Sequence, residues 1–391
     1  MDVSVAFGCA RVTVRISIPT ARRPAWSPAR YEGIRAELNR LGGPSYRYEQ
    51  FTSAVFTQRA VTYRDITVLP RTIRDALADR FGSQVCSLVP RVRVVSRQAT
   101  KVAFGLADQR AIETVQLTYR AGWHSYCISS QVGCGLGCSF CATGTMGLAR
   151  NLTVDEITDQ VLWFWLRGDP VDRVSFMGMG EALANPATFE AIEVFTAPEL
   201  FALSPRRLTV STVGVVPGLQ RLIAEHPRVG ITFSLHSPFD QQRSELVPLH
   251  KRYPTGHVLD VLDVHIRRHN AEVTLAYTLM AGINSSSDHA HALASLLRGR
   301  GAVSRRYHLT LIGYNDSPAL ADRFAAPTRS SIDAFASVLR SAGIRTTVRA
   351  QFGTDVEAGC GQLAGPNRPR HEPRTGPAGS NCGATRQQMS P

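Results

Sequence analysis

The chain has 391 residues, of which 43% are apolar, and it carries a formal net charge of +13. This composition supports a large core. No apolar run approaches the ~18 residues of a membrane span, and the N-terminus lacks the apolar centre of a signal peptide. We therefore expect a cytoplasmic protein without membrane segments. The positive charge indicates a polyanionic partner such as a nucleic acid, although solvated basic faces would give the same balance.

The two ends of the chain differ in composition from its centre. Residues 1–30 mix a short β-like run with Pro and Arg, and residues 365–391 are rich in Pro, Gly and Arg. Such segments bury too little apolar surface to fold alone. We therefore expect a disordered extension at the N-terminus and a disordered tail at the C-terminus.

Residues 31–120 form a first predicted unit. Apolar residues recur at helical spacing over 31–84, for example at Tyr31, Ile34 and Leu38, with turns at 42–44 and around Pro70. Three β-like runs follow, VRVVS, KVAFGL and IETVQL, separated by polar turns. This pattern predicts a small accessory domain, and its arginines are suited to binding RNA.

From about residue 121, apolar strands alternate with amphipathic helices. The expected strands are SYCIS, RVSFMG, RLTVST, GITFSL, VTLAYTLM and YHLTLIG. This alternation is typical of βαβ units and predicts an α/β fold, a partial (β/α)6 barrel over residues 121–364. Thr153 and Glu156 form a capping box at the start of the first helix, which ends near Gly168.

Three cysteines, Cys134, Cys138 and Cys141, stand in a C-x3-C-x2-C spacing within a glycine-rich loop. Three thiolates can hold three corners of a cubane iron–sulfur cluster, which leaves the fourth iron open for a ligand. A zinc site or a redox pair is the alternative, but zinc normally takes four ligands from paired Cys or His units, and no second pair accompanies these three. The bunching of the cysteines in one loop also fits a reducing compartment.

Small and polar residues follow the expected strands at their C-terminal ends, where barrels of this kind carry their chemistry. Each of them alone also fits a turn or a cap, but together they predict one ligand site at the barrel mouth. Glu181 can receive an ammonium group there. The full set is Gly180, Glu181, Ser211, Ser234, Leu235, His236 and Asn315.

Taken in order, CISSQVGC, NLTVDEITDQVL, SFMGMGEALAN, STVGVVPG and the final CGQL resemble the RlmN/Cfr family of radical S-adenosylmethionine (SAM) enzymes, over about residues 31–364. These enzymes methylate adenosine 2503 of 23S ribosomal RNA. FSLHSPF, QRSELVP and QFG resemble the Cfr branch, which acts at carbon 8, whereas the RlmN branch acts at carbon 2. The resemblance therefore implies a radical SAM barrel that methylates carbon 8 and gives resistance to antibiotics of the peptidyl-transferase centre, with carbon 2 as the alternative.

The same resemblance implies roles for individual residues. Cys134, Cys138 and Cys141 would hold a [4Fe–4S] cluster whose open iron binds SAM, and the residues at the barrel mouth would contact SAM. Cys360, in CGQL, resembles the cysteine that is itself methylated, and Cys127 resembles its redox partner. Glu113 matches a proton acceptor of the family.

The implied reaction uses two SAM molecules per turnover. One methylates Cys360, and the other is split to a 5′-deoxyadenosyl radical that takes a hydrogen atom from the methyl group of the methylated Cys360. The implied partners are 23S ribosomal RNA and an electron donor such as flavodoxin or ferredoxin, and we expect a monomer. A radical SAM enzyme of secondary metabolism and a non-catalytic RNA-binding protein with a structural metal are the alternatives, although the presence of both Cys360 and Cys127 argues against the former.

Overall fold

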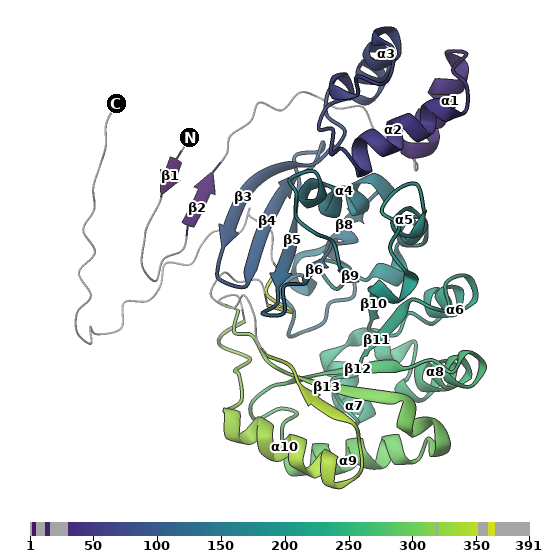
Figure 1. The fold of residues 1–391 in the computed structure, drawn as a ribbon. Helices are drawn as coiled ribbons and strands as arrows, with labels where there is room; N and C mark the ends of the chain where they lie inside the picture. The colour runs from purple at the N-terminus through teal and green to yellow at the C-terminus, as the bar shows by residue number, and fades with distance from the viewer. Residues whose placement is uncertain (1, 5–11, 16–29, 318–319, 351–358, 364–391) are drawn as a thin grey trace.

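The computed structural model describes residues 2–4, 12–15, 30–317, 320–350 and 359–363. The QFG motif, the tail 365–391 and most of the expected extension 1–30 lie outside the described residues. Within the described part, one curved sheet of twelve strands runs through the molecule, and helices cover its outer side (Figure 1).

The accessory region consists of helices followed by antiparallel strands, as the sequence predicts. Its helices pack around Ile34, Phe51 and Leu77, all fully buried. Residues 12–15 form a strand that pairs with the edge of these strands, although the sequence predicted only a short β-like run within a disordered extension. The elements are α1 (Arg30–Arg40), α2 (Tyr46–Phe56), α3 (Arg71–Phe81), β1 (Asp2–Ser4), β2 (Val12–Arg15), β3 (Val89–Val95), β4 (Ala99–Gly105) and β5 (Ala111–Thr118).

The barrel strands are parallel, and all six that the sequence predicts are present. They are β6 (His124–Cys127), β9 (Arg173–Phe176), β10 (Leu208–Thr212), β11 (Gly230–Ser234), β12 (Val273–Leu279) and β13 (Tyr307–Gly313). A further parallel strand, β14 (Thr346–Val348), pairs with β13. Three residues are too few to show a strand pattern in the sequence. The predicted partial (β/α)6 barrel is confirmed, with β14 added at its edge.

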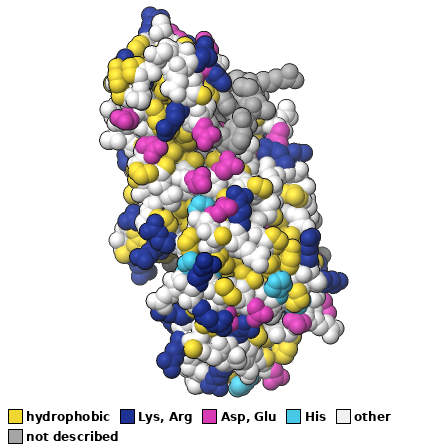
Figure 2. Space-filling view, turned by 90° about the vertical axis from the view of Figure 1, so that its right-hand side faces the viewer, with side chains coloured by type: hydrophobic (Ala, Val, Ile, Leu, Met, Phe, Trp, Pro, Cys, Tyr) yellow, Lys and Arg dark blue, Asp and Glu magenta, His cyan; other side chains and the backbone are white. Residues whose placement is uncertain are grey.

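Helices connect these strands and cover the outer face of the sheet. In the first of them, Thr153 accepts a hydrogen bond from the N–H of Glu156, and the Glu156 carboxylate accepts one from the N–H of Thr153, which confirms the capping box. The outward side of the helical layer mixes basic, acidic and apolar side chains (Figure 2). The helices are α4 (Val154–Trp165), α5 (Ala187–Thr196), α6 (Val216–Glu225), α7 (Asp240–Leu246), α8 (Thr255–His269), α9 (Ser287–Arg298) and α10 (Arg329–Ser341).

The accessory strands and the barrel share one sheet and one core. Strand β5 pairs antiparallel with β6, and this pairing places Val115 opposite Cys127. The buried Arg30 at the start of α1 forms an ion pair with Asp159 of α4. A boundary near residue 120 is therefore not a break in the packing. None of the described helices is long and apolar enough to span a bilayer.

Candidate active site

A cavity of about 120 Å³ lies on the inner side of the barrel strands. Residues from β5, β6 and β13, from the turns after β9 and β14, and from 359–363 line it. Cys127, Cys141 and Cys360 all face this space. The fold thus brings together three cysteines whose sequence positions alone do not show that they meet.

The cysteine loop is held by a short hairpin of its own, β7 (Gln131–Cys134) and β8 (Gly147–Asn151). Gly133 has a φ of +77°, and a Cβ on it would lie 2.0 Å from the carbonyl oxygen of Gly147. A side chain there would force the two strands apart, so glycine is required. The hairpin therefore fixes Cys134 at one end of the loop.

The thiols of this loop are largely shielded from water and act on one another. Burial raises the pKa of Cys134 to about 11 and raises the pKa of Cys138 further, and the neighbouring thiols Cys141 and Cys134 add to the effect at Cys138. Burial also raises the pKa of Cys141. Unligated, these groups stay protonated at neutral pH, and binding to a metal would remove their protons.

The segment carrying Cys360 is attached to the cysteine loop by hydrogen bonds. The N–H of Ala142 donates to the carbonyl of Gly361 over 2.9 Å, and the Thr143 hydroxyl donates to the carbonyl of Leu363 over 2.5 Å. The Asn315 side-chain amide donates to the carbonyl of Cys360 over 3.1 Å. Asn315, predicted as a SAM contact, is thus also a support for the Cys360 segment.

Cys127 and Cys360 differ in exposure. Cys360 is exposed, whereas burial raises the pKa of Cys127 to about 12, with the nearby Cys360 thiol acting in the same direction. The positive charge of Arg349, which lines the same cavity, acts in the opposite direction. Both cysteines are free thiols.

Glu181 lies close to the cysteine loop, where its charge acts on Cys134 and Cys138. Its carboxylate accepts hydrogen bonds from the N–H groups of Val213, over 3.0 Å, and Leu183, over 3.3 Å. Burial raises the pKa of Glu181 to about 7, and these hydrogen bonds limit the rise. A cationic ligand would favour the ionised form further.

The structure also describes the other residues that the sequence predicts at the barrel mouth. His236 packs edge-on against Phe140 of the cysteine loop at 4.8 Å, and its Nδ1 accepts from the N–H of Thr278. Burial, with help from Arg243, lowers the pKa of His236 to about 3, so its ring is neutral. The other members are the buried Leu235, the Ser211 and Ser234 hydroxyls, which lie 3.4 Å apart, and Gly180, whose φ is +96°.

Glu113 lies on β5, where its side chain is buried. Its Oε1 is 3.3 Å from Nζ of Lys101 on the neighbouring strand β4. Glu113 does not line the cavity itself, but Val115 and Leu117 on the same face of β5 do. Strand alternation therefore points Glu113 toward the cavity's side of the sheet.

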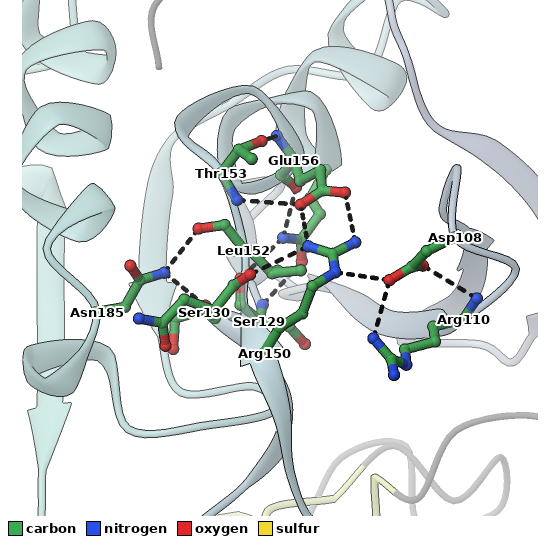
Figure 3. A network of polar contacts seen from close by, with 11 residues as sticks. Asp108, Arg110, Ser129, Ser130, Arg150, Leu152, Thr153, Glu156 and Asn185 are labelled. Carbon is green, nitrogen blue, oxygen red and sulfur yellow. Dashed lines mark hydrogen bonds and ion pairs between the residues drawn. The ribbon is translucent and has the colours of Figure 1, made fainter. Parts of the chain in front are cut away.

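A polar network anchors the hairpin of the cysteine loop to its surroundings (Figure 3). Arg150 of β8 donates to both carboxylate oxygens of Glu156 at the start of α4, over 2.7 and 2.8 Å. Its Nε donates to Asp108, in the turn between β4 and β5, over 2.6 Å. The Asn185 side chain donates to the carbonyls of Ser130 and Leu152. Arg150 thus connects the hairpin to α4 and to the turn between the accessory strands β4 and β5.

Comparisons with known proteins show the family of this chain. Residues 128–297 match the family model of the radical SAM superfamily. Over 336 residues, 86% of this chain and 96% of each relative, the chain is 47% identical to proteins named ribosomal RNA large subunit methyltransferase Cfr from Staphylococcus aureus and Bacillus velezensis. The chain belongs to the RlmN/Cfr family of radical SAM methyltransferases. A crystal structure of a radical SAM methyltransferase from Sphaerobacter thermophilus has a TM-score of 0.80 and 38% identity, over 86% of this chain and 98% of that one.

Membership of the RlmN/Cfr family implies a [4Fe–4S] cluster and SAM. The loop fits a cluster because it offers three free thiols that interact electrostatically. No three His, Cys, Asp or Glu side chains of the described chain gather closely enough to ligate a single metal ion. In a cubane each thiolate binds its own iron atom, so the ligands need not converge on one point.

Two residues of this RlmN/Cfr site were missed by sequence reasoning, Arg349 and Arg243. Arg243 is fully buried and donates to the carbonyls of Val213, Ser234 and Leu235, so it organises the strand ends around Glu181. Arg243 lies within QRSELVP, one of the motifs that resemble the Cfr branch, and this motif was the sequence signal that could have pointed to it. Arg349 follows a strand too short to predict, and no sequence pattern pointed to it.

Proposed function

We propose that this protein methylates carbon 8 of adenosine 2503 in 23S ribosomal RNA through a methylated Cys360. The observation that carries the proposal is the shared cavity, in which Cys360 and Cys127 lie together with Cys141 of the cysteine loop. The relatives named as Cfr ribosomal RNA methyltransferases support the substrate, and the FSLHSPF and QRSELVP motifs support carbon 8. Carbon 2 of the same adenosine is the alternative.

The cofactors have candidate residues on this chain. Cys134, Cys138 and Cys141 would hold the [4Fe–4S] cluster, and Glu181 would receive the ammonium group of SAM bound at the open iron. Bound there, the cluster would supply one-electron chemistry, both the electron for splitting SAM and an acceptor for the electron that the adenine ring gives up. A small redox protein such as flavodoxin or ferredoxin would supply the first electron, and two SAM molecules would be used per turnover.

Cys360 carries the methyl group in this scheme. Carbons 2 and 8 of adenine are electron-poor amidine carbons, so the ring does not attack the methyl group of SAM directly. The exposed Cys360 sulfur instead takes a methyl group by displacement. Transfer of a hydrogen atom from this methyl group to the fragment of split SAM, which becomes 5′-deoxyadenosine, leaves a carbon radical bonded to the Cys360 sulfur. This radical adds to the ring carbon.

Glu113 and Cys127 complete the reaction. Glu113 accepts the proton of the ring carbon, and the ring returns one electron. Cys127 then attacks the Cys360 sulfur, so an S–S bond forms while the bond between sulfur and the transferred carbon breaks. The carbon keeps the electron pair and takes up a proton, which gives the methyl group. The disulfide is afterwards reduced by an external thiol.

The target base must leave its folded RNA surroundings to reach the cavity. Sequence-specific RNA enzymes commonly act on unstacked bases and hold the flanking phosphates with basic side chains. The arginines of the accessory domain are our candidates for these phosphates. We propose that a monomer acts in the cytoplasm, where ribosomes are found.

The test is anaerobic reconstitution followed by reaction with a 23S ribosomal RNA fragment and SAM. We expect a brown protein that forms 5′-deoxyadenosine, and mass spectrometry of the digested RNA should find 8-methyladenosine. Expression in a host that lacks its own enzyme should protect ribosomes from antibiotics bound at the peptidyl-transferase centre. Detection of 2-methyladenosine would overturn only the assignment of the reaction to carbon 8.

The variant Cys360→Ala separates this mechanism from other radical SAM chemistry. It should still split SAM but leave the RNA unmethylated, because the methyl carrier is missing. Full methylation by this variant would refute the role of Cys360. A colourless zinc protein that binds RNA without splitting SAM would instead identify the non-catalytic alternative.

A further inference from the structure

Arg349 occupies the reaction cavity, and neither the sequence motifs nor the family roles described above include it. Arg349 directly follows β14. Its backbone N–H donates to the carbonyl of Leu311 over 2.8 Å, and this bond holds the backbone of Arg349 beside β13. Its side chain lines the cavity together with Cys127 and Cys360. It also forms a side-chain hydrogen bond with Tyr119, whose ring stacks on Trp123 at 3.6 Å.

The charge of Arg349 acts most strongly on Cys360 and less strongly on Tyr119 and Cys127. The negative charge of a Cys360 thiolate is the largest influence that raises the pKa of Arg349, and Tyr119 and Cys127 follow. Cys127 has uncharged neighbours on both flanking strands, Val115 on β5 and Ser175 on β9. The backbone N–H of Met177 bonds to its sulfur. Lys101 lies two strands away on β4, in register with Val115, and it forms an ion pair with Glu113 of β5.

Cys127 faces a chemical difficulty in the proposed function. Only the thiolate attacks a sulfur atom at a useful rate, and burial opposes thiolate formation at this position. A neighbouring cation lowers that cost. Arginine is suited to this task because its guanidinium stays charged when it is largely buried.

We propose that Arg349 is the positioning residue that holds Cys127 as a thiolate next to the Cys360 sulfur and thereby drives release of the methylated base. The inference rests on the proposed function and extends it to the last step. In that step the Cys127 thiolate attacks the Cys360 sulfur of the thioether that links enzyme and RNA. The sulfur–carbon bond breaks, its electron pair stays with carbon, and the protonated Glu113 returns the proton.

The test follows the covalent enzyme–RNA adduct in reconstituted holoenzyme that has first been methylated on Cys360 by SAM alone, with the added methyl group verified by protein mass. After addition of RNA and reductant, the adduct is measured on denaturing gels. We expect Arg349→Met to release it about tenfold or more slowly near neutral pH, and the rate to recover as the pH rises and Cys127 ionises without help. Arg349→Lys should release the adduct at a rate between those of Arg349→Met and the wild type, because a buried ammonium group keeps its charge less well than a guanidinium.

Tyr119→Phe gives a second variant with a milder change. It keeps the stacked ring but removes the hydroxyl bonded to Arg349. Release of the adduct should therefore be slower than in the wild type but faster than in Arg349→Met. Unchanged release in Arg349→Met, or slow release that does not recover with rising pH, would overturn the role of Arg349. Equal slowing in Arg349→Lys would also overturn it, since the charge is then not what matters.

Cys127→Ala distinguishes this inference from the proposed function on which it rests. Without the attacking thiol the adduct must accumulate whatever Arg349 does. Absence of any adduct in Cys127→Ala would contradict the proposed function itself. Its presence there, combined with fast release in Arg349→Met, would contradict only the inference about Arg349.

Discussion

Lys101 and Glu113 form a nearly buried ion pair, with side-chain exposures of 12% and 7%. The chain contains 44 basic residues, and only Lys101 and Lys251 among them are lysines. The Lys101 ammonium group compensates the charge of a carboxylate that is largely removed from water, and its removal leaves that carboxylate without its ion-pair partner. We therefore predict that Lys101→Met lowers RNA methylation by about 10- to 100-fold, with little loss of SAM cleavage.

The measurement is the ratio of methylated adenosine to 5′-deoxyadenosine in single turnovers. Lys251→Met is the matched control because it removes the other lysine from an exposed position, and its ratio should not change. Lys101→Arg should retain most of the activity, because it keeps the positive charge. A normal ratio in Lys101→Met would show that Glu113 does not depend on this partner.

At the scale of elements, the β7–β8 hairpin holds the cysteine loop, and Arg150 connects it to Glu156 and Asp108. Arg150 is 28% exposed, so its ion pairs are partly shielded from water. Hydrogen bonds to charged partners contribute about 1.5–3 kcal/mol each when buried and less near the surface. We predict that Arg150→Met destabilises the protein by about 1–2 kcal/mol and speeds loss of iron from the reconstituted cluster.

Urea unfolding and the rate of iron release to a chelator measure these two effects. Arg329→Met is the control, because Arg329 pairs with Asp333 on the exposed side of α10 and should change stability by about 0.5 kcal/mol or less. Faster iron release without a change in the free energy of unfolding would mean that Arg150 supports the cysteine loop but not the stability of the whole protein. Unchanged iron release would mean that the hairpin holds its shape without Arg150.

Much of this arrangement was predictable at the level of elements, and less at the level of contacts. The strands β6 and β9 to β13 have four to seven residues and alternate with amphipathic helices along the chain, and the α4 capping box is a local pattern of Thr153 and Glu156. The meeting of Cys127 with Cys360 depends on how distant segments pack, which no local pattern encodes. The contact of Arg150 with Asp108 likewise depends on where the β4–β5 turn comes to lie.

At the scale of the whole molecule, the shared sheet changes how RNA binding by the accessory region can be tested. Removal of residues 31–100 would uncover β4 and the core around α4, since β3 pairs with β4, the N–H of Ser87 donates to Asp159 and the Trp165 side chain donates to the carbonyl of Phe56. Loss of activity in such a truncation would therefore reflect unfolding. Substitution of exposed arginines leaves the packing intact.

Arg64, between α2 and α3, and Arg71, at the start of α3, suit this purpose, with side-chain exposures of 68% and 87%. Each phosphate contact contributes about 0.7–0.9 to the slope of log affinity against log salt concentration. We predict that the double change to glutamine lowers this slope by about one to two and weakens RNA binding at physiological salt, while SAM cleavage without RNA is unaffected. Arg268 and Arg305, exposed on the barrel's outer side, give a control pair of equal charge that should leave the slope unchanged. The opposite result, with only the control pair reducing the slope, would place the RNA along the barrel helices, away from the accessory domain.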